Sequence, residues 1–381
     1  MAVVTPPSVR SSFEFSFDQP LATKASPTTT KRKATDVADL RIFMAQLVFL
    51  VTGLISTLGA QWLHYRGAAE SRSMLPVLAT YLGMAAVALL PSDKHSRSYK
   101  PDPNEPKRGY LTIFGVSTLD VLGNVILMVG MFYVGSGLYQ VIYSSVIVFT
   151  ALLSKCFLRR TMSWAQWAAI FAITGGLSLT ALERPERNTK RSEDHTPHPE
   201  TQPIGFILTI LGTAIYAIVY ILNDHILSTN PTTFPPRKLC VQVGSTSTLL
   251  TTLIMLLVSL DTVLAMPLTD SSVIFGYVIL ILSALFHNLT YFELLEGTGA
   301  VATGVLQALR AVMVFGLSHV MFCESDSMQC FTPMKGVATV VVVCGVVGFS
   351  VAKASAGKGK AGFEKVKGDL DEEDAIGMRK I

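Results

Sequence analysis

A permanently charged arginine, Arg310, lies in the middle of the otherwise apolar stretch GVLQALRAVMVFGL at residues 304–317. A charge at the centre of a membrane helix costs about 2.5–3.5 kcal/mol on insertion scales, so such residues usually face a cavity or a partner. At about 100° per residue, Thr303, Gln307 and Arg310 fall within about 60° of one another. Because a guanidinium presents a planar fork of N–H donors that fits phosphate or carboxylate, this stripe is the strongest candidate for binding an anionic solute.

Two further sets of polar side chains have helical spacing in apolar surroundings. Gln140, Tyr143 and Ser144 lie on one side of a second apolar stretch, and Tyr216 and Tyr220 are four residues apart in AIYAIVYILND. The tyrosines are not confined to the ends of the apolar stretches, where interfacial aromatic residues gather. We therefore expect these side chains to line the same solute path as the arginine stripe.

Asp120 and Asn124 are four residues apart in STLDVLGNVIL, so they share one helix face. An acid at membrane depth is either neutral or paired. Asp120 is therefore either the counter-ion of Arg310 or a carboxylate that carries a coupling proton, and both roles are compatible if the pair opens during transport. For Arg310 itself, the alternative to solute binding is a structural ion pair or hydrogen bonds to the carbonyls of neighbouring helices. His287, in ALFHNLTYF, is either a packed, hydrogen-bonded histidine or a proton relay.

Cys323 and Cys330, in FCESDSMQCF, share a short loop between two apolar stretches. In an oxidising lumen the two form a disulfide, and the alternative is a pair of free thiols, because spacing alone does not give the geometry. No cluster with zinc-ligand spacing occurs in the sequence, so we expect no metal and no cofactor.

Long apolar segments must position these side chains, because half of the residues are hydrophobic and only 15% are charged. A hydrocarbon core of about 30 Å needs about 20 apolar residues in a helix. The sequence therefore predicts an all-α integral membrane protein with ten transmembrane helices, at residues 41–63, 73–91, 109–132, 137–158, 163–182, 204–224, 239–260, 271–294, 300–322 and 333–352.

The distribution of Lys and Arg residues predicts the orientation. With the N-terminus in the cytosol, the cytosolic face carries about three times as many of them as the opposite face. Both termini are then cytosolic, which requires an even number of spans. We expect an endomembrane such as the Golgi or the endoplasmic reticulum, with the plasma membrane, vacuole and plastid as alternatives. Because orientation accounts for the basic residues, the net charge of +4 does not indicate nucleic-acid binding.

The sequence contains a weak internal repeat. The turn YVGSGLYQV (133–141) recurs as LEGTGAVAT (295–303), and each is followed by a span, a polar break and a last span rich in small residues. Because each half holds five spans, the second half enters the membrane from the opposite side, so we expect two inverted five-helix repeats with both Gly-rich turns forming tight hairpins. The predicted order is a disordered cytosolic tail (1–40), a first repeat (41–182), a polar non-cytosolic linker (183–203), a second repeat (204–352) and a disordered cytosolic tail (353–381).

The stretch GSGLYQVIYSSVIVFTALLSKCFLRRTMSWAQWAAIFAITGGLSL, at residues 135–179, resembles the end of an EamA-type repeat of the drug/metabolite transporter superfamily. In that family a turn of small residues precedes the fourth helix, and a fifth helix containing Gly-Gly follows a short basic break. The likeness extends to the ten-span layout, and the nucleotide-sugar and solute-carrier-35-like members are the most similar branch. The resemblance implies that the spans 137–158 and 300–322 line the substrate path.

These features together predict a secondary transporter that moves a small organic solute by alternating access. An anionic or phosphorylated metabolite such as a nucleotide sugar fits Arg310, whereas a neutral or cationic metabolite coupled to protons fits if Asp120 neutralises that charge. A non-transporting scaffold or receptor that keeps the fold is a further alternative. The sequence has no HExxH, GxSxG or two-histidine metal spacing, so we expect no enzyme.

The expected partners are the small solute and the lipid bilayer. Small-residue faces at TGG (174–176) and GVVG (345–348) permit a homodimer as well.

Overall fold

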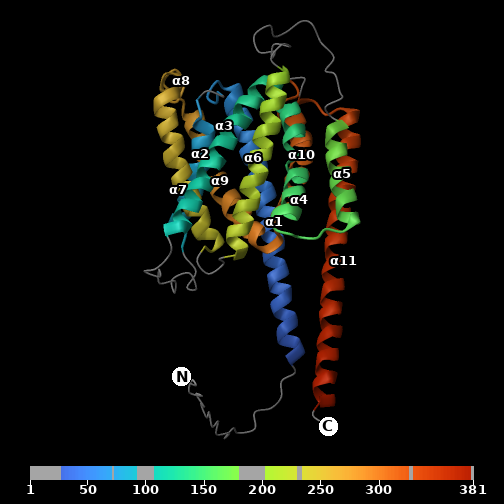
Figure 1. Ribbon diagram of the computed structural model, residues 1–381. Helices are drawn as coiled ribbons and strands as arrows, with labels where there is room; N and C mark the ends of the chain where they lie inside the picture. The colour runs from blue at the N-terminus through green and yellow to red at the C-terminus, as the bar shows by residue number, and fades with distance from the viewer. Residues whose placement is uncertain are drawn as a thin grey trace, which may run out of the picture. The chain divides into compact units, whose positions relative to one another are not determined.

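The computed structural model describes residues 27–70, 73–91, 107–179, 202–229, 234–325 and 329–378. Within these ranges every regular element is a helix and no strand occurs, as Figure 1 shows. Contacts divide the chain into two units, residues 1–41 and 42–381. Helices are the expected answer to a bilayer, because each backbone N–H and C=O must find its partner inside the segment that crosses the hydrocarbon.

The main helices follow the predicted apolar segments closely. They are α1 (Pro27–Tyr65), α2 (Leu75–Ala86), α3 (Lys107–Tyr143), α4 (Val146–Phe157), α5 (Trp164–Leu179), α6 (Gln202–Thr229), α7 (Pro236–Ile254), α8 (Leu260–Leu264), α9 (Ser271–Thr298), α10 (Ala300–Phe322) and α11 (Pro333–Met378). A 3₁₀ turn, Val87–Leu89, extends α2, and a π-helical turn, Met255–Ser259, joins α7 to α8.

Seven of the described helical segments are long and apolar enough to cross a bilayer: Leu40–Tyr65, Tyr110–Met131, Pro203–Thr229, Pro236–Leu264, Ser271–Thr298, Ala300–Phe322 and Pro333–Ser355. Two shorter apolar helices, Leu75–Leu89 and Val146–Phe157, accompany them. The all-helical, multi-pass membrane class is therefore confirmed. The full set of ten spans and the inverted repeat stay predictions.

The predicted disordered tails differ from the structure. Residues 27–40 form the start of α1, and α11 continues without a break to Met378. Lengthening an existing helix needs no new nucleus, so even polar residues can continue it. Residues 1–26 and 379–381, and nearly all of the predicted linker, lie outside the described ranges.

The first of the two Gly-rich turns is not where the sequence predicts it. Residues 133–141 lie inside α3, which ends only at Tyr143, and α4 then begins at Val146. The tight hairpin predicted at 133–141 is therefore wrong. A glycine in a helix interior costs only about 1 kcal/mol, an amount that tertiary packing can offset.

The second Gly-rich turn does interrupt the chain as predicted. α9 ends at Thr298, and α10 begins at Ala300. Gly299 between them has φ +84°, a conformation that glycine adopts without steric cost. A Cβ at Gly299 would also lie 2.5 Å from Nη1 of Arg160, so the position is closed to a side chain on two grounds.

The described helices of the second unit pack around two large hydrophobic cores and two smaller clusters, one of which joins α1 to α10. Core A gathers buried side chains of α1, α2, α3, α6, α7 and α9, together with Ala300 at the start of α10. Core B gathers those of α4, α5, α11 and the remainder of α10. Helix α10 therefore belongs to core B along most of its length and reaches core A at its first residue.

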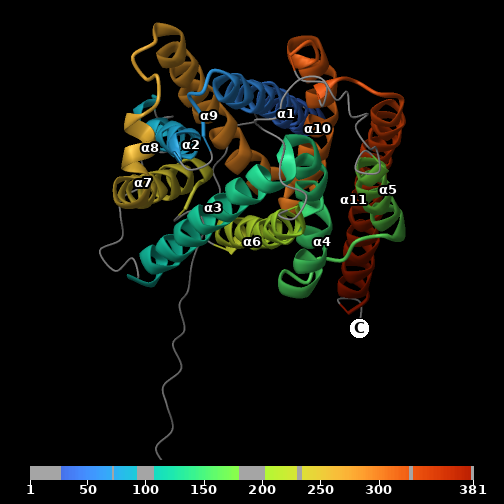
Figure 2. The ribbon, with the colours of Figure 1, turned by 90° about the horizontal axis from the view of Figure 1, so that it is seen from above.

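Two close helix pairs join the predicted halves of the chain, α3 with α6 and α5 with α11, and Figure 2 shows both pairs side by side. Glycines permit the approach of α3 to α6. A Cβ at Gly130 would lie 2.5 Å from Oγ1 of Thr209, and one at Gly212 would lie 2.7 Å from Cγ of Leu127. Small residues bring membrane helices into backbone contact in this way.

Candidate functional site

Arg310 lies on α10, half-buried, and its side chain crosses to α1. A Cβ at Gly53 of α1 would lie 2.6 Å from Cδ and 3.1 Å from Nη1 of Arg310. The missing side chain of Gly53 therefore leaves the space that the arginine occupies. Leu54 and Leu58 of α1 share a small hydrophobic cluster with Val314 and Phe322 of α10, so the guanidinium lies where these two helices meet.

The charge of Arg310 has no acidic partner. In the part of the chain that the structure describes, Arg310 takes part in none of the ion pairs and none of the hydrogen bonds. Its electrostatic neighbours are four neutral rings, those of Tyr139, Tyr143, Tyr220 and His287. The predicted pair with Asp120 is not formed in this conformation.

Asp120 is instead held by neutral donors. Its carboxylate is buried on α3 and accepts hydrogen bonds from the hydroxyls of Tyr81 and Tyr216. Asn124, on the same face of α3, donates its Nδ2 to Tyr81 Oη at 2.5 Å and to Tyr216 Oη at 2.6 Å. The result is a closed network of two tyrosines between the acid and the amide, with α2 and α6 contributing one ring each.

Tyrosine rings extend from this network toward Arg310. Centroid distances are 5.7 Å for Tyr139 and Tyr143, 6.0 Å for Tyr143 and Tyr216, 6.1 Å for Tyr216 and Tyr220, and 5.1 Å for Tyr220 and Tyr291. Aromatic pairs favour such separations. The sequence singled out Tyr143, Tyr216 and Tyr220 but missed Tyr139 and Tyr291. The spacing of Tyr139, four residues before Tyr143, was the available signal.

Gln307 links the tyrosine series to the arginine helix. It lies one turn before Arg310 on α10, and its Nε2 donates to Tyr220 Oη at 3.1 Å. Its Oε1 is buried and has no hydrogen-bond partner among the described residues. A buried acceptor of this kind is costly to leave unpaired and therefore suggests a missing donor.

Two predicted path residues, Thr303 and Ser144, are placed differently from expectation, and a third cannot be located from the described side chains. Thr303 is fully buried, and its hydroxyl donates to the carbonyl oxygen of Gly299 at 3.1 Å, so its hydrogen bond lies within the first turn of α10. Ser144 lies buried in the turn between α3 and α4 rather than on a helix face. The side chain of Gln140 lies outside the described part of the structure. Local spacing could not foresee the helix break that displaces Ser144.

His287 is packed and hydrogen-bonded. Its ring stacks on Phe49 at a centroid distance of 4.3 Å, and its Nδ1 lies 3.0 Å from the carbonyl oxygen of Phe49 and 3.4 Å from Oγ1 of Thr52. A ring tied to α1 in this way favours the packed alternative over a proton relay.

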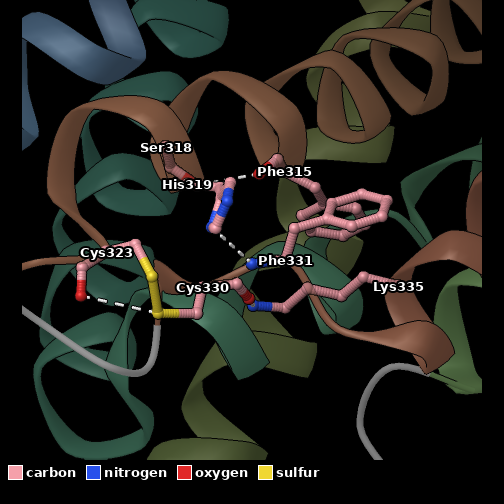
Figure 3. The surroundings of a disulfide bond; sticks show 7 residues. All are labelled: Phe315, Ser318, His319, Cys323, Cys330, Phe331 and Lys335. Carbon is pink, nitrogen blue, oxygen red and sulfur yellow. Dashed lines mark hydrogen bonds between the residues drawn. A yellow bond between two sulfur atoms is a disulfide. The ribbon is translucent and has the colours of Figure 1, made fainter.

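The loop after α10 holds the predicted disulfide. Cys323 and Cys330 are bonded, with their Cα atoms 4.5 Å apart, as Figure 3 shows. His319 Nδ1 accepts the backbone N–H of Phe331 at 3.0 Å, and Lys335 Nζ donates to the carbonyl of Cys330 at 2.7 Å. Among the described residues, His319, Cys323 and Cys330 form the group that comes closest to a metal-ligand cluster, and the disulfide occupies both of its sulfur atoms.

Two hollows flank α5, away from Arg310. One, of about 350 Å³, is lined by Lys155 and by Met162, Trp164, Trp167 and Phe171. The other, of about 520 Å³, has only small and apolar residues of α5 and α11 in its walls. A solute site needs several converging polar groups. The surroundings of Arg310 meet that requirement and the two hollows do not.

Comparison with known proteins matches residues 43–182 to the EamA-like transporter family. Proteins described as "Solute carrier family 35 member F6" from Homo sapiens and Pongo abelii are each 28% identical over 199 residues, which is 48% of this chain and 52% of theirs. The protein of that description from Mus musculus is 27% identical over 200 residues. The chain therefore spans about half the length of the curated relatives it matches.

One solved crystal structure shares the fold, with a TM-score of 0.56 at 14% identity, covering 82% of this chain and 96% of that chain. The family match falls on the half that carries Asp120 and Asn124 and ends with α5. Long apolar helices, the family match and the relatives agree with one another. Residues 43–182 of the chain are thus similar to the EamA-like transporter family, and about half of the chain is similar to members of solute carrier family 35.

Proposed function

We propose that the protein is a secondary transporter that carries a small organic anion, with Arg310 as the anion-binding group. The observation that carries this proposal is the charge of Arg310, which is half-buried among the helices and has neither an acidic partner nor a hydrogen bond among the described residues. A charge buried without a partner is destabilising, so a protein gains from keeping one only where a ligand completes it.

The position between the cores supports a transport role. Arg310 extends from core B toward Gly53 of α1, and its charge reaches Tyr220 of α6 and His287 of α9, all in helices of core A. A solute bound there contacts helices of core A and of core B. Rocking of one group of helices against the other exposes such a site to either side of the membrane in turn, as in transporters built from inverted repeats. Ten spans in two inverted copies, with both termini cytosolic, belong to this proposal.

The neighbouring groups suggest which anion fits. Arg310 offers a fork for phosphate or carboxylate, and the unpaired Oε1 of Gln307 offers an acceptor for a hydroxyl or amide of the solute. Tyr139, Tyr143 and Tyr220 add ring faces and hydroxyls at the same place. A phosphorylated metabolite with a sugar or a flat ring, such as a nucleotide sugar, meets all three demands.

A second function has one observation in its favour. The carboxylate of Asp120 is buried, and its hydrogen-bond donors are the neutral hydroxyls of Tyr81 and Tyr216. Intramembrane acids of this kind occur in the proton relays of pumps and transporters. Proton-coupled transport of a neutral or cationic metabolite through Asp120 is therefore the alternative to anion transport at Arg310.

Uptake into proteoliposomes separates the two functions. The panel holds a nucleotide sugar, a sugar phosphate, an amino acid and an organic cation, each offered with and without a pH gradient. We expect uptake of an anion, and in Arg310→Gln a loss of at least about 30-fold, because truncating one side of a buried charge contact costs about 2–5 kcal/mol. Arg66→Gln, at an exposed arginine, is the matched control and keeps full uptake. Unchanged anion uptake by Arg310→Gln contradicts the proposal.

We also propose an endomembrane location and a homodimer, from the sequence. Fluorescence imaging of the tagged full chain and its mass in lipid nanodiscs test these two points.

A further inference from the structure

A bidentate ion pair links the loop after α4 to α6. Nη1 of Arg160 donates to Oδ2 of Asp224 at 2.7 Å, and Nη2 donates to Oδ1 at 3.0 Å. The side chain of Asp224 is only 3% exposed, whereas that of Arg160 is 42% exposed. Oδ2 of Asp224 also accepts the backbone N–H of Ala300 at 3.0 Å. Both oxygens of a buried acid are therefore occupied, in the geometry that makes such pairs strong.

The pair joins the two cores at one end of the helices. Arg160 lies between α4 and α5, which belong to core B, and Asp224 lies on α6, which belongs to core A. Ala300, the third member, begins α10. Figure 1 shows the loop between α4 and α5 at the lower end of these helices, opposite α8. The Lys and Arg distribution predicts that this end is cytosolic.

The neighbouring backbone is arranged around the pair. Arg159 has φ +52°, a left-handed conformation that a residue with a side chain adopts only at a cost, and it directly precedes Arg160. Gly299 has no side chain where a Cβ would meet Nη1 of Arg160 at 2.5 Å. Lys353 of α11 donates to the carbonyl of Thr298 at 2.7 Å and so attaches another core B helix to the same turn.

At the opposite end of the described helices, α1 and α10 meet through apolar contacts, with the ring centroids of Tyr65 and Phe322 5.2 Å apart, and the ion pair there lies within core A. Arg66 lies 4.0 Å from Asp270, and both side chains are about half exposed. Asp270 caps the start of α9 by accepting the backbone N–H of Ser272 at 2.9 Å, and this bond lowers the pKa of Asp270 below its ordinary value. Such an exposed pair contributes little to holding the two ends together.

From this asymmetry we infer that Arg160 and Asp224 form a latch that closes the cytosolic end of the solute path and opens once in each transport cycle. The inference rests on the proposed transport function. Separation of the cores at this end breaks both hydrogen bonds between Arg160 and Asp224. While the latch is closed, the path to Arg310 can open only at the opposite end, where α1 and α10 meet through apolar side chains and no buried ion pair of the described residues joins them.

Thiol labelling near the latch tests this inference. Thr303→Cys places a reporter on α10 one turn beyond Ala300, at a position that is fully buried when the latch is closed. Cys156 and Cys344, the exposed free cysteines, are replaced by Ser, and the disulfide and the buried Cys240 are kept. The protein in lipid nanodiscs is then pulsed with a charged, membrane-impermeant maleimide.

We expect slow labelling of Cys at position 303 with the latch intact. Asp224→Asn raises the rate at least about tenfold, because it removes the charge that holds Arg160. Arg160→Lys gives a smaller increase, since lysine keeps the charge but loses the planar fork. Asp270→Asn, which weakens the pair at the other end, is the matched control and leaves the rate unchanged.

Cys240 reports on folding in each sample, because it is completely buried. Equal labelling of position 303 in folded wild-type and Asp224→Asn proteins overturns the latch. If labelling of Cys240 shows that Asp224→Asn unfolds the protein, the rate of labelling at position 303 in Arg160→Lys decides whether the latch exists. If Cys240 becomes exposed in both variants, the ion pair is a static structural contact, and the latch is overturned. Loss of anion uptake in Arg310→Gln with no labelling change in Asp224→Asn removes the latch but keeps the transport function. The reverse result keeps the latch and removes anion transport.

Discussion

Arg160 and Arg310 are two arginines in the same helical unit that meet opposite surroundings. Arg160 reaches a buried carboxylate and is bound by it at two points, although its own side chain is 42% exposed. Arg310 is half-buried among tyrosines and a stacked histidine and has no acid to pair with in the described structure. The charge of Arg160, which is nearer to water, is thus neutralised by an acid, whereas the interior charge of Arg310 has no acidic partner among the described residues.

The difference separates a charge that holds the protein from a charge that awaits a ligand. A paired charge stabilises one arrangement of the helices, and its loss is felt in stability. An unpaired interior charge lowers the stability of the protein, and binding of an anion restores that stability. The two arginines therefore predict opposite responses to neutralisation, and the variants below test that contrast from the largest effect to the smallest.

Neutralising the acid of the paired arginine has the largest effect on stability. Asp224→Asn leaves Arg160 without its partner and lowers the free energy of unfolding by about 3 kcal/mol, the lower end for buried pairs because Arg160 can turn toward water. Thermal melting of the purified protein in detergent measures the loss. Asp270→Asn at the exposed pair changes stability by less than about 0.5 kcal/mol. Equal melting of both variants contradicts the distinction between the two pairs.

Removal of the disulfide tests the far end of the arginine helix. Cys323 and Cys330 are seven residues apart, and a loop of that length gives a stabilisation of about 2 kcal/mol in the chain-entropy account. Replacing both cysteines by Ser lowers the melting temperature but leaves anion uptake at the wild-type level, because Arg310 lies more than three helical turns away along α10. A loss of uptake that exceeds the loss of folded protein shows that the loop participates in transport.

Filling the space beside Arg310 tests its position. In Gly53→Ala the new Cβ meets Cδ of Arg310 at 2.6 Å, so the guanidinium must move. We expect anion affinity to fall about tenfold, which corresponds to about 1.4 kcal/mol. Gly59→Ala on the same helix is the control, because a Cβ there meets no atom within 4 Å. Equal affinity of the two variants indicates that Arg310 does not bind the anion from this position.

We expect the smallest change in anion uptake for a substitution of Asp120. If the anion binds at Arg310 and the two groups are not paired, Asp120→Asn changes anion uptake by less than about threefold, since groups that share no direct contact act nearly independently. Uptake is measured with and without a pH gradient. A variant that loses only the gradient-driven part of uptake supports the proton-coupled alternative instead.

The sequence predicted the features that depend on local pattern. The length of the apolar segments predicted helices, and the four-residue spacing predicted that Asp120 and Asn124 share a helix face. The position of Cys323 and Cys330 in one short loop allowed the disulfide to be predicted. The sequence placed the first helix break wrongly because glycine weakens a helix only slightly, so that packing decides where the helix ends. The actual break at 144–145 has no glycine to mark it.

Long-range pairing was beyond local pattern. Nothing in the local sequence pattern links Arg160 with Asp224, yet the fold places Nη1 of Arg160 2.7 Å from Oδ2 of Asp224. Conversely, opposite charge suggested that Asp120 pairs with Arg310, but α2 and α6 supply tyrosines that satisfy the acid first. Which partner a buried charge finds depends on how helices distant in sequence pack, and periodicity within one helix does not contain that information.

The most direct test of the central claim is the melting temperature of wild type and Arg310→Gln, each with and without the anion that the uptake panel identifies. Without the anion, we expect Arg310→Gln to melt at a higher temperature than wild type, because it removes an uncompensated interior charge. With the anion, wild type gains stability by mass action and Arg310→Gln does not. An Arg310→Gln protein that melts below wild type and is still stabilised by the anion would show that Arg310 supports the fold and does not bind the solute.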